Sequence, residues 1–306
     1  MSTVALLSGG VGGARMARGL ASVLGPHHPT IVVNVGDDED IYGLHVSPDV
    51  DTVMYTLAGV EGPEGWGTAG DTFRVMESLA ALEMDTTFRI GDRDLAVNLA
   101  RTGALRAGEP LSTVTAHICR RHGVGQPLLP ATDDRLRTMV EIAGGRRLTF
   151  QEYFVFRAHR DRVAALHFEG AVGARPGPGV LESIAGADLV VIAPSNPPLS
   201  IWPILAIPGI RDALAAARVV AVSPLFGGKA LKGPADRVMA ALGLPPGNGG
   251  VIAAYEGLLD LLIVDTADEP GMISAKDGPR VVAADTRIAE PRDAARFSEW
   301  LLTEAL

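Results

Sequence analysis

Residues 4–20, "VALLSGGVGGARMARGL", set the fold class of this 306-residue chain. The opening apolar run predicts a buried strand, the glycines predict a tight turn, and the segment from Ala14 has the pattern of a helix. In α/β proteins such a turn binds phosphate, because glycines let the backbone approach an anion and the helix N-terminus presents N–H groups to it. The sequence therefore predicts phosphate contacts at the residues of this turn: Ser8, Gly9, Gly10, Gly12 and Gly13.

The two common phosphate motifs do not fit this turn. The dinucleotide fingerprint needs Gly or Ala at the position of Arg15, and the phosphate loop needs a Lys-Ser/Thr pair that is missing. A tight strand–helix turn without any ligand is the alternative interpretation.

Further apolar runs alternate with helical patterns along the rest of the chain. Strands are expected at 30–35, 187–193 and 218–223, and helices at 51–59 and 71–84, each with an Asp-Thr pair as its cap, and at 111–123 and 291–302. Strands that lack period-two alternation and are separated by helices favour a parallel sheet covered on both faces. We expect an α/β, Rossmann-like three-layer sandwich with a mostly parallel sheet, formed by residues 1–130 and 177–306.

Residues 131–176 have a different pattern. Apolar and polar residues alternate on either side of Gly144 and Gly145, through "TMVEI" and "RRLTFQEYFVF", which is typical of a hairpin. The segment 162–172 can add a third strand. We expect a small antiparallel β insertion, or lid, over residues 131–176.

The composition limits the classes of function. A net charge of −9 does not match the basic surface of a nucleic-acid binder, and no apolar run approaches the roughly 20 residues of a membrane span. The single cysteine, Cys119, fits a reducing compartment. We therefore expect a cytoplasmic protein that acts on small molecules.

Six carboxylates crowd the segment that follows the second strand, "VNVGDDEDIYGLHVSPDVDT". Ligands of open parallel sheets lie outside the carboxyl ends of the strands, so these acids should face the same crevice as the glycine turn. A magnesium ion held between carboxylates and substrate phosphates would relieve their repulsion. We expect Asp37 and Asp49 to be the metal ligands, with Asp38 next, whereas a solvated acidic loop is the alternative. Asp51 is expected to cap a helix.

Three further segments carry polar groups after predicted strands. Ser195, Asn196 and Pro197 follow a buried strand and can bind a base or ribose. Lys229, on a glycine-rich loop with Lys232, can contact an anion, although a solvated lysine is equally expected. In residues 88–102 charges of both signs alternate, which favours a self-neutralising surface cluster that includes Arg101.

Taken together, "SGGVGGAR", "SPDVDTVMYTLAG", "GDRDLA", "PSNP" and "GGKALKGPA" resemble the 2-phospho-L-lactate transferase family of coenzyme F420 biosynthesis, over roughly residues 4–265. The resemblance implies a GDP-linked donor that carries a lactyl, enolpyruvyl or glyceryl acid, and the deazaflavin alcohol Fo as acceptor. The ribityl hydroxyl of Fo would attack, GMP would leave, and Mg²⁺ would be required. It also implies Fo contacts at Asp49 and Arg89, and a homodimer.

The chemistry expected from the residues agrees with this resemblance. Phosphoryl transfer needs positioning and charge neutralisation more than covalent catalysis, which suits Asp37 and Asp49 as catalytic residues. Asp49 can be either a metal ligand or a general base. The donor's acid stays open.

Two other functions compete with this transferase. A related family of gluconeogenesis-factor type consists of non-catalytic regulators that bind nucleotide sugars. A nicotinamide dehydrogenase is disfavoured by Arg15, and by Asn34 at the end of the second strand.

Overall fold

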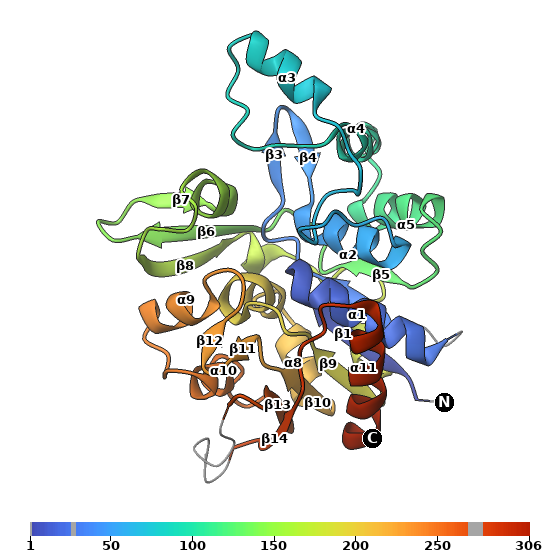
Figure 1. Cartoon of the computed structure of the whole chain (residues 1–306), viewed down its shortest axis with the longest axis vertical. Coiled ribbons are helices and arrows are strands. Elements are labelled where there is room, and N and C mark those ends of the chain that lie inside the picture. The colour runs from blue at the N-terminus through green and yellow to red at the C-terminus, as the bar shows by residue number, and fades with distance from the viewer. Residues whose placement is uncertain (1, 26–28, 269–277) are drawn as a thin grey trace.

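A parallel β-sheet of seven strands forms the centre of the computed structural model, which describes residues 2–25, 29–268 and 278–306 (Figure 1). Its strands are ordered β14-β13-β10-β9-β1-β2-β5, and every neighbouring pair is parallel. Their bounds are β1 (Val4–Ser8), β2 (Thr30–Val33), β5 (Leu128–Pro130), β9 (Leu189–Ile192), β10 (Val219–Val222), β13 (Leu261–Asp265) and β14 (Arg280–Ala284). The predicted α/β fold class is confirmed.

Helices flank this sheet. The four strands β1, β9, β10 and β13 are buried at every residue, which requires cover on both faces because successive side chains point to opposite sides. Helix α1 packs against both α2 and α11. The helices are α1 (Gly10–Leu24), α2 (Pro48–Ala58), α3 (Arg74–Ala81), α4 (Asp92–Arg106), α5 (Leu111–Arg121), α6 (Val180–Ala185), α7 (Trp202–Leu205), α8 (Ile210–Ala215), α9 (Ala235–Ala241), α10 (Asn248–Ala254) and α11 (Pro291–Ala305).

The strand order locates the ligand crevice. From β1 the sheet grows through β2 to β5 on one side, and from β9 through β10, β13 and β14 on the other. The order therefore reverses between β1 and β9, and open α/β sheets bind ligands at the carboxyl ends of the strands beside such a point.

A three-stranded antiparallel sheet lies in the predicted insertion, ordered β7-β6-β8 (Figure 1). Its strands are β6 (Arg137–Ile142), β7 (Arg147–Thr149) and β8 (Val163–Glu169). It has its own apolar cluster, which includes Val140, Leu148 and Tyr153 and also contacts Leu199 of the main domain. The bounds 131–176, and any motion as a lid, stay a prediction.

The prediction that the second hairpin strand continues through Phe156 is wrong. Residues Glu152–Phe156 form a π-helical turn, η1. The Glu152 carboxylate accepts from the Thr149 backbone N–H at 2.8 Å, and the Thr149 hydroxyl accepts from the Glu152 N–H at 3.2 Å. This reciprocal pair is a capping box, which starts a helical turn where strand alternation alone predicts a strand.

The caps expected for α2 and α3 are also wrong. Helix α2 begins at Pro48, so Asp51 lies inside its first turn. Asp71, instead of capping α3, accepts from the Arg93 and Asp94 N–H groups at the start of α4, at 2.9 and 3.2 Å. Asp92 in turn accepts from two N–H groups at the start of α3, at 3.1 Å each. The two helix N-termini therefore exchange caps, which fixes α3 against α4.

Two short strand pairs and two helical turns complete the part of the fold that the structure describes. The acidic segment itself forms a hairpin of β3 (Glu39–Ile41) and β4 (Leu44–Val46), and β11 (Leu225–Phe226) pairs with β12 (Lys229–Ala230). Residues Pro197–Ile201 form a second π-helical turn, η3, and Ala171–Gly173 form a 3-10 turn, η2. In the described residues no helix is both long enough and apolar enough to cross a membrane.

Candidate active site

The candidate site lies where β1, β2 and β9 end. Gly9 follows β1 and Ser195 follows β9, and the two residues are directly bonded. The Ser195 hydroxyl donates to the Gly9 carbonyl oxygen at 2.7 Å and accepts from the Gly9 N–H at 3.2 Å. The turn predicted to bind phosphate and the segment predicted to bind a base or ribose are thus joined at the switch point of the sheet.

Close packing explains the glycines of the first turn. Gly10 has φ +65°, which favours glycine. A Cβ on Gly12 would lie 2.3 Å from the carbonyl oxygen of Pro194, and a Cβ on Gly13 would lie 2.3 Å from the Ser8 hydroxyl. The turn requires glycine with or without a phosphate, so its phosphate contacts stay a prediction.

Asp49 lies between the first turns of two helices. It is in the first turn of α2, and its Oδ1 accepts from the Gly10 N–H at the start of α1 at 2.7 Å. A carboxylate is favoured there by the positive end of the helix dipole. Its Oδ2 accepts from the Asn34 side-chain amide at 2.9 Å, and the same amide donates to Asp37. The structure therefore brings together Asp37 and Asp49, as predicted.

The two carboxylates are almost fully buried, with exposures of 5% for Asp37 and 6% for Asp49. Burial raises the pKa of Asp49 to about 6, against the hydrogen bonds from Asn34 and Gly10. Burial, and next the charge of Asp49, hold the pKa of Asp37 well above its usual range. Two acids held this close cannot both ionise easily without a cation between them.

Asp38 is buried beside this pair. Its Oδ2 accepts from the Ser47 hydroxyl at 2.9 Å and contacts the His45 Nε2 at 3.0 Å. Among the described residues its Oδ1 has no hydrogen-bond partner. Farther along the same segment, Glu39 is partly exposed and Asp40 is exposed.

Asp51 belongs to a buried ion pair, not to a helix cap. The Arg101 guanidinium donates to both of its carboxylate oxygens, one of them at 3.0 Å. Arg101 is 1% exposed, so the prediction of a surface charge cluster is wrong for this residue. Burial by itself would lower the pKa of Arg101, but the charge and hydrogen bonds of Asp51, together with the charge of Asp38, outweigh burial and raise it, so the guanidinium stays charged.

Arg89 lies just before α4. Its side chain is exposed, and its guanidinium carbon is 4.2 Å from the centre of the Phe73 ring. A cation over an aromatic face is held in place but remains open to an anion. The structure therefore leaves Arg89 free to contact a ligand, and its role with Fo stays a prediction.

The remaining predicted residues have mainly structural contacts. The Asn196 side chain caps η3 by accepting from the Leu199 N–H at 3.2 Å, and Pro197 is buried in that turn. Lys229 is exposed on β12, while Lys232 forms an ion pair with Glu64 at 3.6 Å. These contacts do not test binding of the donor by Ser195, Asn196, Pro197 or Lys229.

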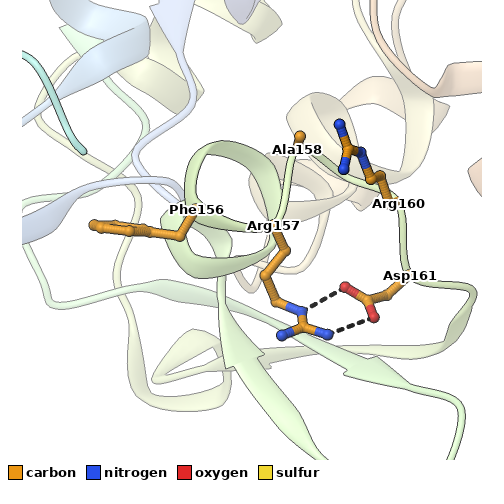
Figure 2. Close-up of a pocket in the computed structure, with 5 residues that line it drawn as sticks. All are labelled: Phe156, Arg157, Ala158, Arg160 and Asp161. Carbon is orange, nitrogen blue, oxygen red and sulfur yellow. Dashed lines mark hydrogen bonds and ion pairs between the residues drawn. The ribbon is translucent and has the colours of Figure 1, made fainter.

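Surface hollows in the described part of the chain include two that neither Asp37 nor Asp49 lines. One, of about 360 Å³, is formed by the end of η1 and the turn after it, and Figure 2 shows Arg157 directed at Asp161 while Phe156 and Arg160 point elsewhere. The Arg157 guanidinium donates to both carboxylate oxygens of Asp161, at 2.5 and 2.7 Å, and no predicted site residue lines this hollow.

The other hollow, of about 200 Å³, lies between residues 36–40 and the insertion and includes Asp38. We assign the site from the carboxylate geometry.

Asn34 and Gln151 are site residues that sequence reasoning missed. Asn34 holds both central carboxylates, and Gln151 of the insertion donates to the Asp37 carbonyl oxygen at 2.9 Å. A polar residue at the end of an apolar strand was the available signal for Asn34. Gln151 had none, because its partner is 114 residues away in the chain.

A magnesium ion fits the chemistry of this donor set. Asp37 and Asp49 supply oxygen ligands, and a cation would offset the buried negative charge that their raised pKa values reflect. Within the described part of the chain, no three His, Cys, Asp or Glu side chains converge as a metal cluster. In phosphoryl-transfer sites Mg²⁺ usually completes its coordination with phosphate oxygens and water.

The chain is similar to known proteins over most of its length. The family model "2-phospho-L-lactate transferase CofD" matches residues 4–297. A phosphoenolpyruvate transferase from Streptomyces griseus is 45% identical over 87% of this chain and 86% of that protein, and one from Thermobifida fusca is 42% identical over 96% and 95%. A solved member of the UPF0052 family from Bacillus halodurans has a TM-score of 0.65 at 19% identity, covering 98% of this chain and 99% of its own. That structure shows likeness of fold alone.

Proposed function

Because this chain belongs to the 2-phospho-L-lactate transferase CofD family, we propose that it transfers the phosphate-linked three-carbon acid of a GDP-linked donor to Fo. Membership makes it a transferase of coenzyme F420 biosynthesis. The donor, the acceptor and the requirement for Mg²⁺ are the finer part, which we infer from the site. The product would be the coenzyme without its glutamates, and GMP would be released.

The observation that carries the proposal is the buried pair Asp37 and Asp49 beside the N-terminus of α1. Both acids lie at the carboxyl ends of the strands, and Asp49 is bonded to the Gly10 N–H. Raised pKa values in both acids indicate a site built for a cation or for proton transfer. Binding of a diphosphate with Mg²⁺ would account for both the position beside the N-terminus of α1 and the raised pKa values of the two acids.

The reaction is an in-line displacement at phosphorus. The terminal ribityl oxygen of Fo forms a bond to the phosphorus that carries the acid, and the bond from that phosphorus to the bridging oxygen breaks, so GMP leaves with the bond pair. When bound, Mg²⁺ offsets the charge of the diphosphate. Asp49, with a pKa of about 6, is mostly ionised at neutral pH and can accept the hydroxyl proton.

Enolpyruvate is the acid that we propose for the donor. The support is that the similar proteins from Streptomyces griseus and Thermobifida fusca are both named phosphoenolpyruvate transferases. Lactyl and glyceryl donors differ from it only around one carbon, so they are the controls. A nucleotide-sugar-binding regulator is not favoured, since the family match is to a transferase.

The test is product analysis with each donor. Purified protein is incubated with Fo, Mg²⁺ and the enolpyruvyl, lactyl or glyceryl derivative of GDP, and mass spectrometry identifies the products. We expect GMP release only when Fo is present, and fastest turnover of the enolpyruvyl donor. Release of GMP without Fo, or no reaction with any donor, would reject the proposal. Light scattering in solution would test the homodimer that we also propose.

A further inference from the structure

The loop between α2 and α3 is firmly attached at several points. Within this segment, residues 59–70, which we call the Trp66 loop, Glu61 pairs with Arg18 of α1 and forms a β-bridge with Thr68. The Ala69 N–H donates to the Val60 carbonyl oxygen at 2.8 Å, and the Arg93 guanidinium donates to the Ala69 carbonyl oxygen at 3.1 Å. The loop therefore connects α1 to α4 and has little freedom of its own.

The tip of the Trp66 loop is a tight glycine turn. The Gly62 N–H donates to the Gly67 carbonyl oxygen at 2.9 Å, and the Gly65 N–H donates to the Gly62 carbonyl oxygen at 2.9 Å. Gly65 and Gly67 have φ of +91° and +61°, which suits glycine and few other residues. The turn holds the Trp66 backbone in one conformation.

Trp66 itself is left uncovered by this rigid loop. It is 55% exposed, whereas the chain's two other tryptophans, Trp202 and Trp300, are partly buried. A single exposed apolar residue is ordinary on a protein surface. A large aromatic side chain at the tip of a loop that is held on both sides is less ordinary, because more than half of the Trp66 surface stays exposed although the loop around it is ordered.

The position of the tip links it to the candidate site. A Cβ on Gly65 would lie 2.5 Å from a methyl group of Val11, so the tip rests on the first turn of α1, next to the Gly10 N–H that binds Asp49. From the other side, Lys232 reaches Glu64 of the same loop at 3.6 Å. Trp66 is thus next in the chain to a residue that touches the start of α1.

We propose that Trp66 is a stacking platform for the planar ring system of a substrate. That the stacked ring belongs to a substrate rests on the proposed function, in which both substrates carry a planar ring system: guanine in the donor and the deazaflavin in Fo. Tryptophan offers a large, rigid π-face at small entropic cost, and a pre-ordered loop reduces that cost further. Guanine and the deazaflavin would both stack on the indole ring, and separate binding measurements distinguish which of them does.

The test compares two replacements of Trp66 with a matched control. The dissociation constants of GDP and of Fo are measured separately, by calorimetry, for the wild type, Trp66→Phe, Trp66→Ala and Trp300→Ala. Stacking on an aromatic side chain is worth about a tenfold or larger factor in affinity. We expect Trp66→Ala to weaken one of the two ligands about tenfold and leave the other unchanged. Trp66→Phe should retain most of the affinity, and Trp300→Ala should match the wild type.

Three results would overturn the platform. They are unchanged affinity for both ligands in Trp66→Ala, equal weakening of both ligands with no rescue by Phe, and the same weakening in Trp300→Ala. Wild-type protein that bound neither GDP nor Fo would refute the proposed function instead. Stacking would then be measured with guanosine and riboflavin as plain ring probes, and equal affinity of the wild type and Trp66→Ala for both probes would still reject it.

Discussion

Replacement of Arg101 by methionine should destabilise the protein strongly. Methionine keeps much of the length and apolar volume of the arginine stem but removes the charge that faces Asp51. Because Arg101 is 1% exposed and Asp51 is 5% exposed, the orphaned carboxylate has no access to water. The Asn98 side chain would also lose the Arg101 guanidinium, which lies 2.8 Å from its oxygen.

The expected size follows from the burial. Removing one partner of a buried ion pair costs about 3–5 kcal/mol, since an uncompensated charge remains inside. In a chain of this size that loss lowers the melting temperature by about 5–8 °C. The exposed pair of Arg296 and Asp285, 3.0 Å apart, gives the matched control, because removing an exposed pair costs about 1 kcal/mol or less.

The assay is urea unfolding followed by circular dichroism, for Arg101→Met, Asp51→Asn, the double variant and Arg296→Met. The double variant should be more stable than the sum of the two single losses predicts, because it leaves no unpaired charge. If Arg101→Met unfolds within about 1 kcal/mol of the wild type, the pair is not a desolvated ion pair and the reasoning fails.

Three other changes test the site. Asp49→Asn should abolish turnover. Because the pKa of the Asp49 carboxyl is raised in the folded protein, its contribution to metal-free stability is complete below its ordinary pKa and is lost as pH rises through about 6. Thermal melts at pH 5 and 8 should show this loss of stability in the wild type and not in Asp49→Asn. Gly12→Ala should lower the melting temperature, because the new Cβ would meet the Pro194 carbonyl oxygen, whereas Gly103→Ala, where a Cβ enters open space, should not. Equal melting temperatures of these two variants would contradict this reasoning. Arg89→Ala should raise KM for Fo at least tenfold more than KM for the donor, and equal increases would remove Arg89 from the Fo site.

Local patterns in the sequence predicted four strands of the sheet and the two acids, Asp37 and Asp49, that the structure brings together. The buried strands β1, β2, β9 and β10 appear as apolar runs because both of their faces are covered, and that property is visible in a few consecutive residues. The rule that ligands lie at the carboxyl ends of parallel strands then joined Asp37 and Asp49 to the glycine turn. The resemblance that the chain's motifs carry was confirmed by the family match.

Partners distant in the chain were decided only by the tertiary structure. Arg101 looked like a member of a solvated cluster, but it is buried against Asp51, which is 50 residues earlier in the chain. Asp71, which lies before α3, caps α4, and Asp92, at the start of α4, caps α3. No local pattern predicts this exchange. Burial and pairing depend on which segments the fold brings together, and the pKa of a carboxyl depends on both. For that reason the sequence could propose that acids gather after β2 and that Asp49 faces the ligand, whereas only the packed chain shows their partners. Asp49 accepts from the start of α1, and Asp51 pairs with a buried arginine.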